Sequence, residues 1–100
     1  MNTRTKGARV ESLAKKKLEK EGWLVFKKDH TRWSPGDIYG QFDMIATKGN
    51  TTRYIQIKSN KSDFYTARKS VAKWVKDTGV TSPCEVWLYE GKSQWRCETI

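Results

Sequence analysis

The pattern of hydrophobic positions divides the chain into seven elements. Apolar residues recur at helical spacing over residues 7–21, and Gly22 ends this first predicted helix. A second helix is predicted to begin at Ser62 or Asp63, either of which can cap it, and to end at Gly79. Short apolar or alternating runs bounded by turn residues predict five strands, at 23–26, 42–48, 53–59, 84–90 and 93–98. The predicted order is therefore α-β-β-β-α-β-β.

This order predicts an α+β (mixed α/β) fold in which a central mixed sheet is flanked by helices. A chain of 100 residues, 36% of them hydrophobic, has room for one core, so we expect a single domain over residues 1–100. Residues 29–41 contain Pro35, Gly36 and Gly40 and are predicted to form a loop.

The central predicted hairpin gathers polar residues on one face of the sheet. If Gly49-Asn50 is a two-residue loop, Asp43 lies opposite Gln56; a four-residue loop would instead place Asp43 opposite Lys58. Because side chains alternate along a strand, either loop puts these three polar side chains on the same face. The opposite, apolar face would then hold Phe42, Met44, Ile55 and Ile57.

A carboxylate, an amide oxygen and a lysine in this arrangement suit metal-dependent phosphodiester hydrolysis. Mg²⁺ prefers oxygen ligands, and a bound divalent cation polarises water and neutralises developing charge. A neighbouring lysine such as Lys58 orients the attacking water and stabilises the charged transition state. From the short pattern alone, the alternative is that Asp43 and Lys58 are solvent-facing residues at strand ends.

The charge of the chain indicates an acidic partner. It has 20 Lys and Arg against 11 Asp and Glu, a net charge of +9 that is concentrated in residues 1–30 and 61–76. Nucleic acid is the usual partner of such a domain, and the alternatives are a solubilising surface or a basic protein-interaction domain. There is no long apolar run and no signal peptide, so we expect no membrane association and a cytoplasmic location, which includes a viral or phage protein acting in a host cell. No P-loop is present, so no nucleotide cofactor is expected.

The two cysteines, Cys84 and Cys97, fall on neighbouring predicted strands. A bridge between them is geometrically conceivable, but two cysteines make no disulfide framework and lack metal-ligand spacing. We expect buried free thiols.

The segment 6–11 (KGARVE), Gly22-Trp23, Asp43 and Gln56-Ile57-Lys58 together resemble archaeal Holliday junction resolvases, within the PD-(D/E)xK nuclease superfamily. The resemblance spans about residues 6–75. The resolvases usually carry Glu where this chain has Gln56, and the QxK form is similar to virus-type replication-repair nuclease domains. The resemblance implies a restriction-endonuclease-like αβββαβ core and a homodimeric, Mg²⁺- or Mn²⁺-dependent DNA endonuclease. Branched or junction DNA would be its substrate, in DNA repair or recombination.

The resemblance also implies a set of four catalytic residues. These are the helix acid Glu11, the metal-bridging acid Asp43, the second-strand ligand Gln56 and the catalytic lysine Lys58, of which the first three would hold the metal. Two alternatives stay open. Glu11 could instead be a surface ion-pair partner of Lys15, and the loop residue Asp37 could be an alternative ligand.

DNA contacts are expected from basic, hydroxyl and aromatic side chains near this set. They are Lys6, Arg9, His30, Arg32, Trp33, Ser34, Lys61, Arg68 and Lys69. Several of them have a structural alternative: a satisfied histidine at His30, a ring packed over the core at Trp33, and plain solvated surface at Arg68 and Lys69. The alternative function is a nuclease-fold DNA-binding module with weak or no cleavage activity, because Gln56 replaces an acid.

Overall fold

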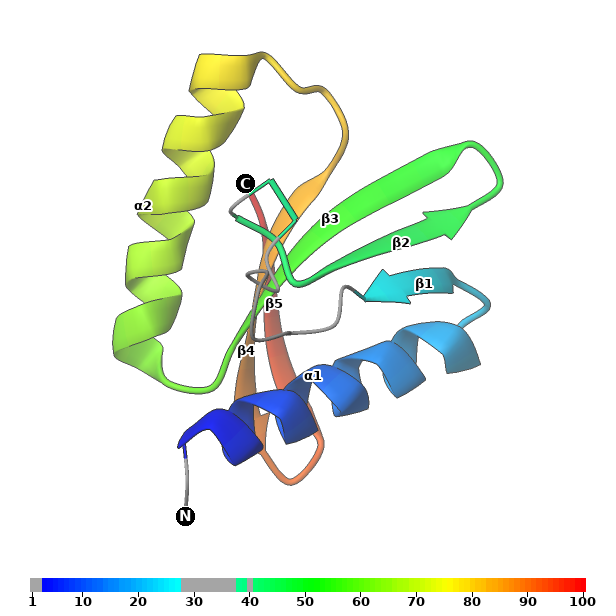
Figure 1. Ribbon diagram of the computed structural model, residues 1–100, viewed down its shortest axis with the longest axis vertical. Coiled ribbons are helices and arrows are strands. Elements are labelled where there is room, and N and C mark those ends of the chain that lie inside the picture. The colour runs from blue at the N-terminus through cyan, green and yellow to red at the C-terminus, as the bar shows by residue number, and fades with distance from the viewer. Residues whose placement is uncertain (1–2, 28–37, 40) are drawn as a thin grey trace.

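The computed structural model describes residues 3–27, 38–39 and 41–100, with side chains from residue 7 onward. The elements follow the predicted order (Figure 1). They are α1 (Thr3–Lys20), β1 (Leu24–Lys27), β2 (Met44–Lys48), β3 (Thr51–Lys58), α2 (Lys61–Thr78), β4 (Cys84–Gly91) and β5 (Gln94–Thr99).

The five strands form one mixed sheet in the order β1-β2-β3-β4-β5. All neighbouring pairs are antiparallel except β3 and β4, which are parallel because α2 carries the chain back across the sheet. The predicted register of the central hairpin is confirmed: Lys48 pairs with Thr51 around Gly49-Asn50, and Met44 pairs with Ile55. The predicted α+β architecture with a central mixed sheet is therefore correct.

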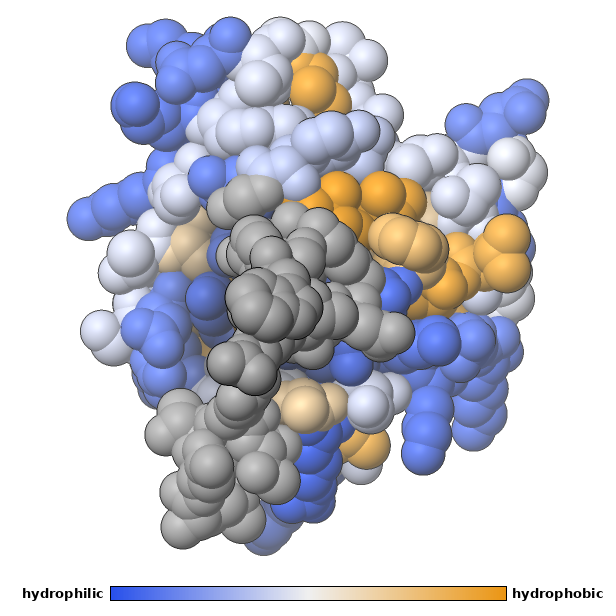
Figure 2. Space-filling model, in the orientation of Figure 1, coloured by the Kyte–Doolittle hydropathy of each residue, from blue (hydrophilic) through white to orange (hydrophobic). Residues whose placement is uncertain are grey.

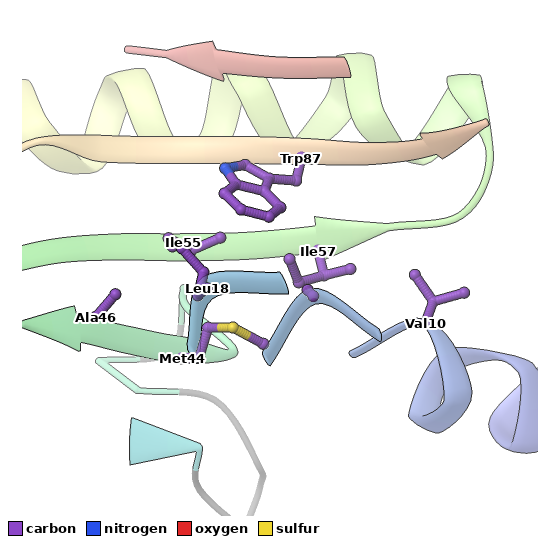
Figure 3. Packing of buried hydrophobic residues seen from close by; sticks show 8 residues of the cluster. Val10, Leu18, Met44, Ala46, Ile55, Ile57 and Trp87 are labelled. Atoms are coloured by element: carbon purple, nitrogen blue, oxygen red, sulfur yellow. The ribbon is translucent and has the colours of Figure 1, made fainter. Parts of the chain in front are cut away.

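A helix packs on each face of this sheet. The α1 face forms a core from Val10, Ala14 and Leu18 of the helix with Met44, Ala46, Ile55, Ile57 and Trp87 of the strands (Figure 3). On the other face, α2 packs Phe64, Ala67 and Val71 against Cys84, Val86 and Leu88. In Figure 3, Val10 lies toward Ile57, so the N-terminal half of α1 extends toward the Lys58 end of β3.

The structure corrects the predicted face of Phe42. Phe42 belongs to the core on the α2 face, with its ring centroid 5.4 Å from that of Tyr54 and 5.2 Å from that of Trp74. The alternation fails because β2 begins only at Met44 and the chain bends at Asp43. Gln56 and Lys58 lie on this same face. They do not face open solvent, because α2 packs on their side of the sheet.

The cap of α2 and the turn of the last hairpin also differ from their predicted positions. The cap of α2 is Asn60, not Ser62 or Asp63: the Asn60 side chain accepts the Asp63 N–H at 2.8 Å and donates to the Asp63 carboxylate at 2.8 Å. The predicted strands 84–90 and 93–98 put the last hairpin turn at Gly91-Lys92, but the turn residues are Lys92 and Ser93, with φ of 51° and 61°. Positive φ at both central residues is what a type I′ hairpin turn requires.

The surface has an apolar area beside its basic regions. Figure 2 shows hydrophilic side chains along the helices and an apolar area over β1 and β2. Leu24 and Phe26 of the edge strand β1 are 77% and 60% exposed, because α2 packs on β3 and β4. None of the helices in the described ranges is long and apolar enough to cross a membrane.

Candidate active site

The candidate site lies just before the first residue of β2, where β3 continues without β2 beside it. β2 begins at Met44, opposite Ile55, whereas β3 runs on to Lys58. The final residues of β3, Gln56-Ile57-Lys58, keep their ladder with β4, where Gln56 pairs with Val86. The edge of β3 that faces away from β4 is thereby left without a β2 ladder over these three residues.

Asp43 occupies this edge and is bonded to β3 at two points. Its N–H donates to the Ile55 carbonyl at 2.9 Å, and its Oδ2 accepts the Ile57 N–H at 2.6 Å. The residue is only 8% exposed. A carboxylate that accepts a backbone N–H is fixed in place by a charge-assisted hydrogen bond. The Asp43 carboxylate is therefore positioned by the backbone of the strand that carries the other two hairpin residues.

Gln56 supplies a buried oxygen on the strand whose backbone holds the Asp43 carboxylate. The ladder between β2 and β3 ends at the pair Met44 and Ile55. Asp43, where the chain bends, donates its N–H to the Ile55 carbonyl, and Gln56 is the next residue of β3. The Oε1 atom of Gln56 is buried and has no hydrogen-bond partner among the described residues. Because nearly all buried polar atoms are paired, and an unpaired one costs about 1–3 kcal/mol, such an atom calls for an explanation. An oxygen of this kind can accept a cation.

Lys58 and Glu11 lie toward the same end of the sheet but on opposite faces, because Glu11 belongs to α1 whereas Lys58 pairs with Leu88 of the α2 core. Lys58 is half-buried and lies two residues beyond Gln56, so both side chains leave the strand on one face. Glu11 is half-buried on α1, and its Oε1 lies 3.9 Å from the Nζ atom of Lys27. Lys27 pairs with Met44, the residue after Asp43. One cation near Glu11 is therefore Lys27 of β1, which places this acid near the strand next to β2.

The donor set fits a hard divalent cation. Asp43 and Glu11 offer carboxylate oxygens and Gln56 an amide oxygen, which are the ligand types that Mg²⁺ and Mn²⁺ take. No group of three or more His, Cys, Asp and Glu side chains suited to a metal is found within the described parts of the chain.

The predicted DNA contacts are only partly placed. Arg9, Lys61 and Lys69 are exposed. Arg68 instead forms an ion pair with Glu98 of β5, with 2.5 Å between Nε and Oε2, and its guanidinium lies 5.9 Å from the Phe64 ring centroid. The remaining predicted residues lie outside those whose side chains are described. They are Lys6, His30, Arg32, Trp33, Ser34 and the alternative ligand Asp37.

Sequence reasoning missed a second polar cluster, on the α1 face. The Arg53 guanidinium forms two bonds to the Glu85 carboxylate, at 2.5 and 2.6 Å, and Trp87 Nε1 donates to Glu85 at 3.0 Å. The Trp23 ring centroid lies 4.7 Å from the guanidinium carbon. The hydrogen bond to Glu85 raises the pKa of Arg53. An acid inside the apolar run 84–88 was the available signal.

Comparisons with known proteins bear on the fold. No known protein family matches the chain. Among solved structures the chain is similar to Hjc of Archaeoglobus fulgidus, a Holliday junction resolvase from an archaeal hyperthermophile. The TM-score is 0.64 at 20% identity, over 94% of this chain and 72% of that one. The chain has the fold of an archaeal Holliday junction resolvase. The predicted restriction-endonuclease-like fold, and the resemblance that implied it, are confirmed at this level.

The chain also shares sequence with a curated protein. It is described as a UPF0102 protein, from Sulfurovum sp. (strain NBC37-1), and is 36% identical over 58 residues. The match covers 58% of this chain and 48% of the relative, so the chain spans about half the length of the curated relative that it matches.

Proposed function

We propose that the protein is a Mg²⁺- or Mn²⁺-dependent DNA endonuclease that hydrolyses phosphodiester bonds in branched or junction DNA. The observation that carries this proposal is the buried Asp43 carboxylate, bonded to the backbone of β3, the strand that also carries the buried Gln56 oxygen without a hydrogen-bond partner among the described residues. Lys58 lies on the same strand end. The fold shared with a Holliday junction resolvase supports the choice of substrate.

In this proposal each residue has a separate role. Asp43, Gln56 and Glu11 hold the cation, which when bound polarises a water and neutralises charge at the phosphate. The Lys58 ammonium orients the attacking water and stabilises the negative charge that develops on the phosphate oxygens. The bond from the Ile57 N–H keeps the Asp43 carboxylate in position before substrate arrives. Gln56 is neutral where the resolvases carry an acid, so it binds the cation less strongly than Glu would.

DNA binding in this proposal rests on the positive charge of the chain. The net charge of +9 attracts the phosphate backbone, and Arg9, Lys61 and Lys69 are exposed to contact it. The proposed contacts of the loop (His30, Arg32, Trp33 and Ser34) and of Lys6 join them.

A homodimer is part of the proposal because symmetric cleavage of a junction needs two sites. The exposed Leu24 and Phe26 of the edge strand β1 support it, since an uncovered apolar edge strand is a surface on which chains associate.

A substrate panel tests the activity. The protein is incubated with four-way, flap, single-stranded and linear duplex DNA, each in Mg²⁺, Mn²⁺ or EDTA. We expect cleavage in either metal, none in EDTA, and faster cleavage of the branched substrates than of linear duplex. Cleavage that persists in EDTA, or no cleavage of any substrate in either metal, contradicts the proposal.

A second candidate is a DNA-binding module with weak or no cleavage, which Gln56 favours because it lacks the charge of the usual acid. The substitution Gln56→Glu separates the two candidates in the same panel. A wild-type protein that binds but does not cut, together with a variant that cuts, supports the module. A wild-type protein that already cuts supports the nuclease.

A further inference from the structure

A groove runs between α1 and the hairpin of β4 and β5, on the edge of α1 opposite to Glu11. It encloses about 590 Å³. One wall comes from the C-terminal half of α1 and the other from the hairpin; the lining residues are Leu13, Lys16, Lys17, Lys20, Glu21, Tyr89, Ser93 and Trp95.

The topology explains why the groove exists. α1 packs on β1 and β3 through the row Val10, Ala14 and Leu18. Tyr89 and Trp95 pair across β4 and β5 on the same face as Trp87, beyond the strands that α1 covers. The helix therefore leaves a trough between its lysine-rich edge and these two rings.

The groove is also separate from the candidate active site. At helical spacing, Glu11 lies to one side of the buried row of α1, whereas Leu13, Lys16 and Lys20 lie to the other. Glu11 approaches Lys27 of β1, at the opposite edge of the sheet from β5. The two sites use different edges of one helix.

The helix wall of the groove is positively charged. Lys16 and Lys20 are exposed, and no ion pair to either is found within the described residues. Lys17 is paired with Glu21 at 2.8 Å, which leaves the other two lysines as the net charge of this wall.

The sheet wall is aromatic and held in place. The ring centroids of Tyr89 and Trp95 lie 4.9 Å apart, and Trp95 packs edge-on against the buried Trp87 at 5.4 Å. The Ser93 N–H donates to the Tyr89 hydroxyl at 3.2 Å. Fixed rings lose little conformational entropy when a flat ligand stacks on them.

We propose that this groove binds a single-stranded nucleic acid segment, with phosphates on Lys16 and Lys20 and a base against Trp95 and Tyr89. A cationic track beside aromatic platforms is the combination by which single strands are held without sequence readout, since every base has a face that stacks. An acidic polypeptide would satisfy the lysines but has no planar group for the rings. The proposal does not depend on cleavage at Lys58.

The test is fluorescence anisotropy of a labelled oligothymidylate of about 15 nucleotides, close to the upper site size of a single-strand-binding fold. EDTA is present throughout, so failure of the nuclease proposal cannot affect the result. The double variant Lys16→Ser/Lys20→Ser is compared with Lys73→Ser/Lys76→Ser, which removes the same charge from exposed positions of α2. We expect about tenfold weaker binding in the groove variant and less than about twofold in the control.

A second arm tests the aromatic wall. Wild-type protein and Trp95→Leu are titrated with the oligothymidylate and with an abasic strand of equal length. We expect Trp95→Leu to lose about tenfold on the oligothymidylate and to match wild type on the abasic strand. If circular dichroism shows that Trp95→Leu is unfolded, the test uses the wild-type protein alone. We then expect wild type to bind the oligothymidylate about tenfold more tightly than the abasic strand.

Three results would overturn the proposal. One is an equal loss in the groove variant and the α2 control, which would mean diffuse electrostatic binding. Another is equal affinity of the wild-type protein for abasic and base-containing strands. The last is competition by polyglutamate as effective as competition by the oligonucleotide, which would assign the groove to an acidic polypeptide.

Discussion

Strand β3 carries two polar sites that differ in whether their buried polar atoms have hydrogen-bond partners. Near its start, Arg53 bonds both carboxylate oxygens of Glu85, and one of them also accepts Trp87. Near its end, the Gln56 oxygen is buried without a partner among the described residues. A fully paired cluster stabilises a fold, whereas an unpaired buried acceptor costs stability. We interpret the first site as structural, and the unpaired oxygen of the second supports our proposal that this site receives a ligand.

The largest effect that separates the two sites is on cleavage. Replacing Lys58 by Ala should lower the rate of DNA cleavage by about 100- to 1,000-fold, because a charge that stabilises the transition state is lost. DNA affinity should stay within about twofold, since one of 20 basic residues is removed. Single-turnover cleavage and anisotropy measure the two quantities. A Lys58→Ala variant that cleaves DNA at the wild-type rate would show that Lys58 is not a catalytic residue.

Breaking the paired site should affect stability instead. Glu85→Ala leaves the half-buried Arg53 guanidinium without its carboxylate, so we expect the free energy of unfolding to fall by about 3 kcal/mol. Urea denaturation measures the change. The matched control is Glu90→Ala, an exposed position of the same strand, where a change within about 0.5 kcal/mol is expected. An equal fall in the free energy of unfolding in both variants would show that the contact between Arg53 and Glu85 has no structural role.

Removing the unpaired oxygen should have a smaller effect of opposite sign. Gln56→Leu removes an amide oxygen that is buried without a partner among the described residues and puts an apolar group of similar size in its place, so the free energy of unfolding should rise by about 1 kcal/mol. Metal-dependent cleavage should fall in the same variant. Gln94→Leu, at an exposed position of β5, serves as the control for a general effect of leucine. A loss of stability in Gln56→Leu would show that this oxygen already has a partner.

The smallest effect concerns the thiols, which are free as predicted, although only Cys84 is buried. Cys97 pairs with Trp87 on the α1 face, whereas Cys84 belongs to the α2 core, so the sheet separates them. Burial, and then the charge of Glu85, raises the pKa of the Cys84 thiol. The unfolded chain therefore releases this proton first, and stability should fall as pH rises above about 8.5, the ordinary thiol pKa.

Two measurements check the thiol prediction. Urea titrations at several alkaline pH values should show a steeper fall of stability for wild type than for Cys84→Ala. A thiol-reactive dye should modify Cys97 in the folded protein and Cys84 only after denaturation. Rapid modification of both thiols in the folded protein would contradict the burial of Cys84.

The sequence allowed the order of elements and the central register to be predicted because local signals specify both. Gly49-Asn50 fixes the hairpin, and Gly22 and Gly79 end the helices with φ of 93° and 70°. The position of Phe42 was wrong because alternation assumes a regular strand, and the chain bends at Asp43.

Other features depend on contacts between distant segments. The bonds between Arg53 and Glu85 require the parallel pairing of β3 with β4, which no local pattern encodes. The approach of Glu11 to Lys27 likewise depends on how α1 crosses β1. The site residues were found by their chemistry and their resemblance, and their roles stay predictions.

The central claim is that Asp43 and Gln56 together hold a divalent cation, and Mn²⁺ binding tests it without any substrate. Isothermal titration calorimetry would compare wild type with Asp43→Asn, Gln56→Glu and the exposed control Glu90→Gln. We predict at least about tenfold weaker binding for Asp43→Asn, about tenfold tighter binding for Gln56→Glu, and no change in the control, because each carboxylate ligand adds to cation affinity. The same Mn²⁺ affinity in all four proteins would contradict the account.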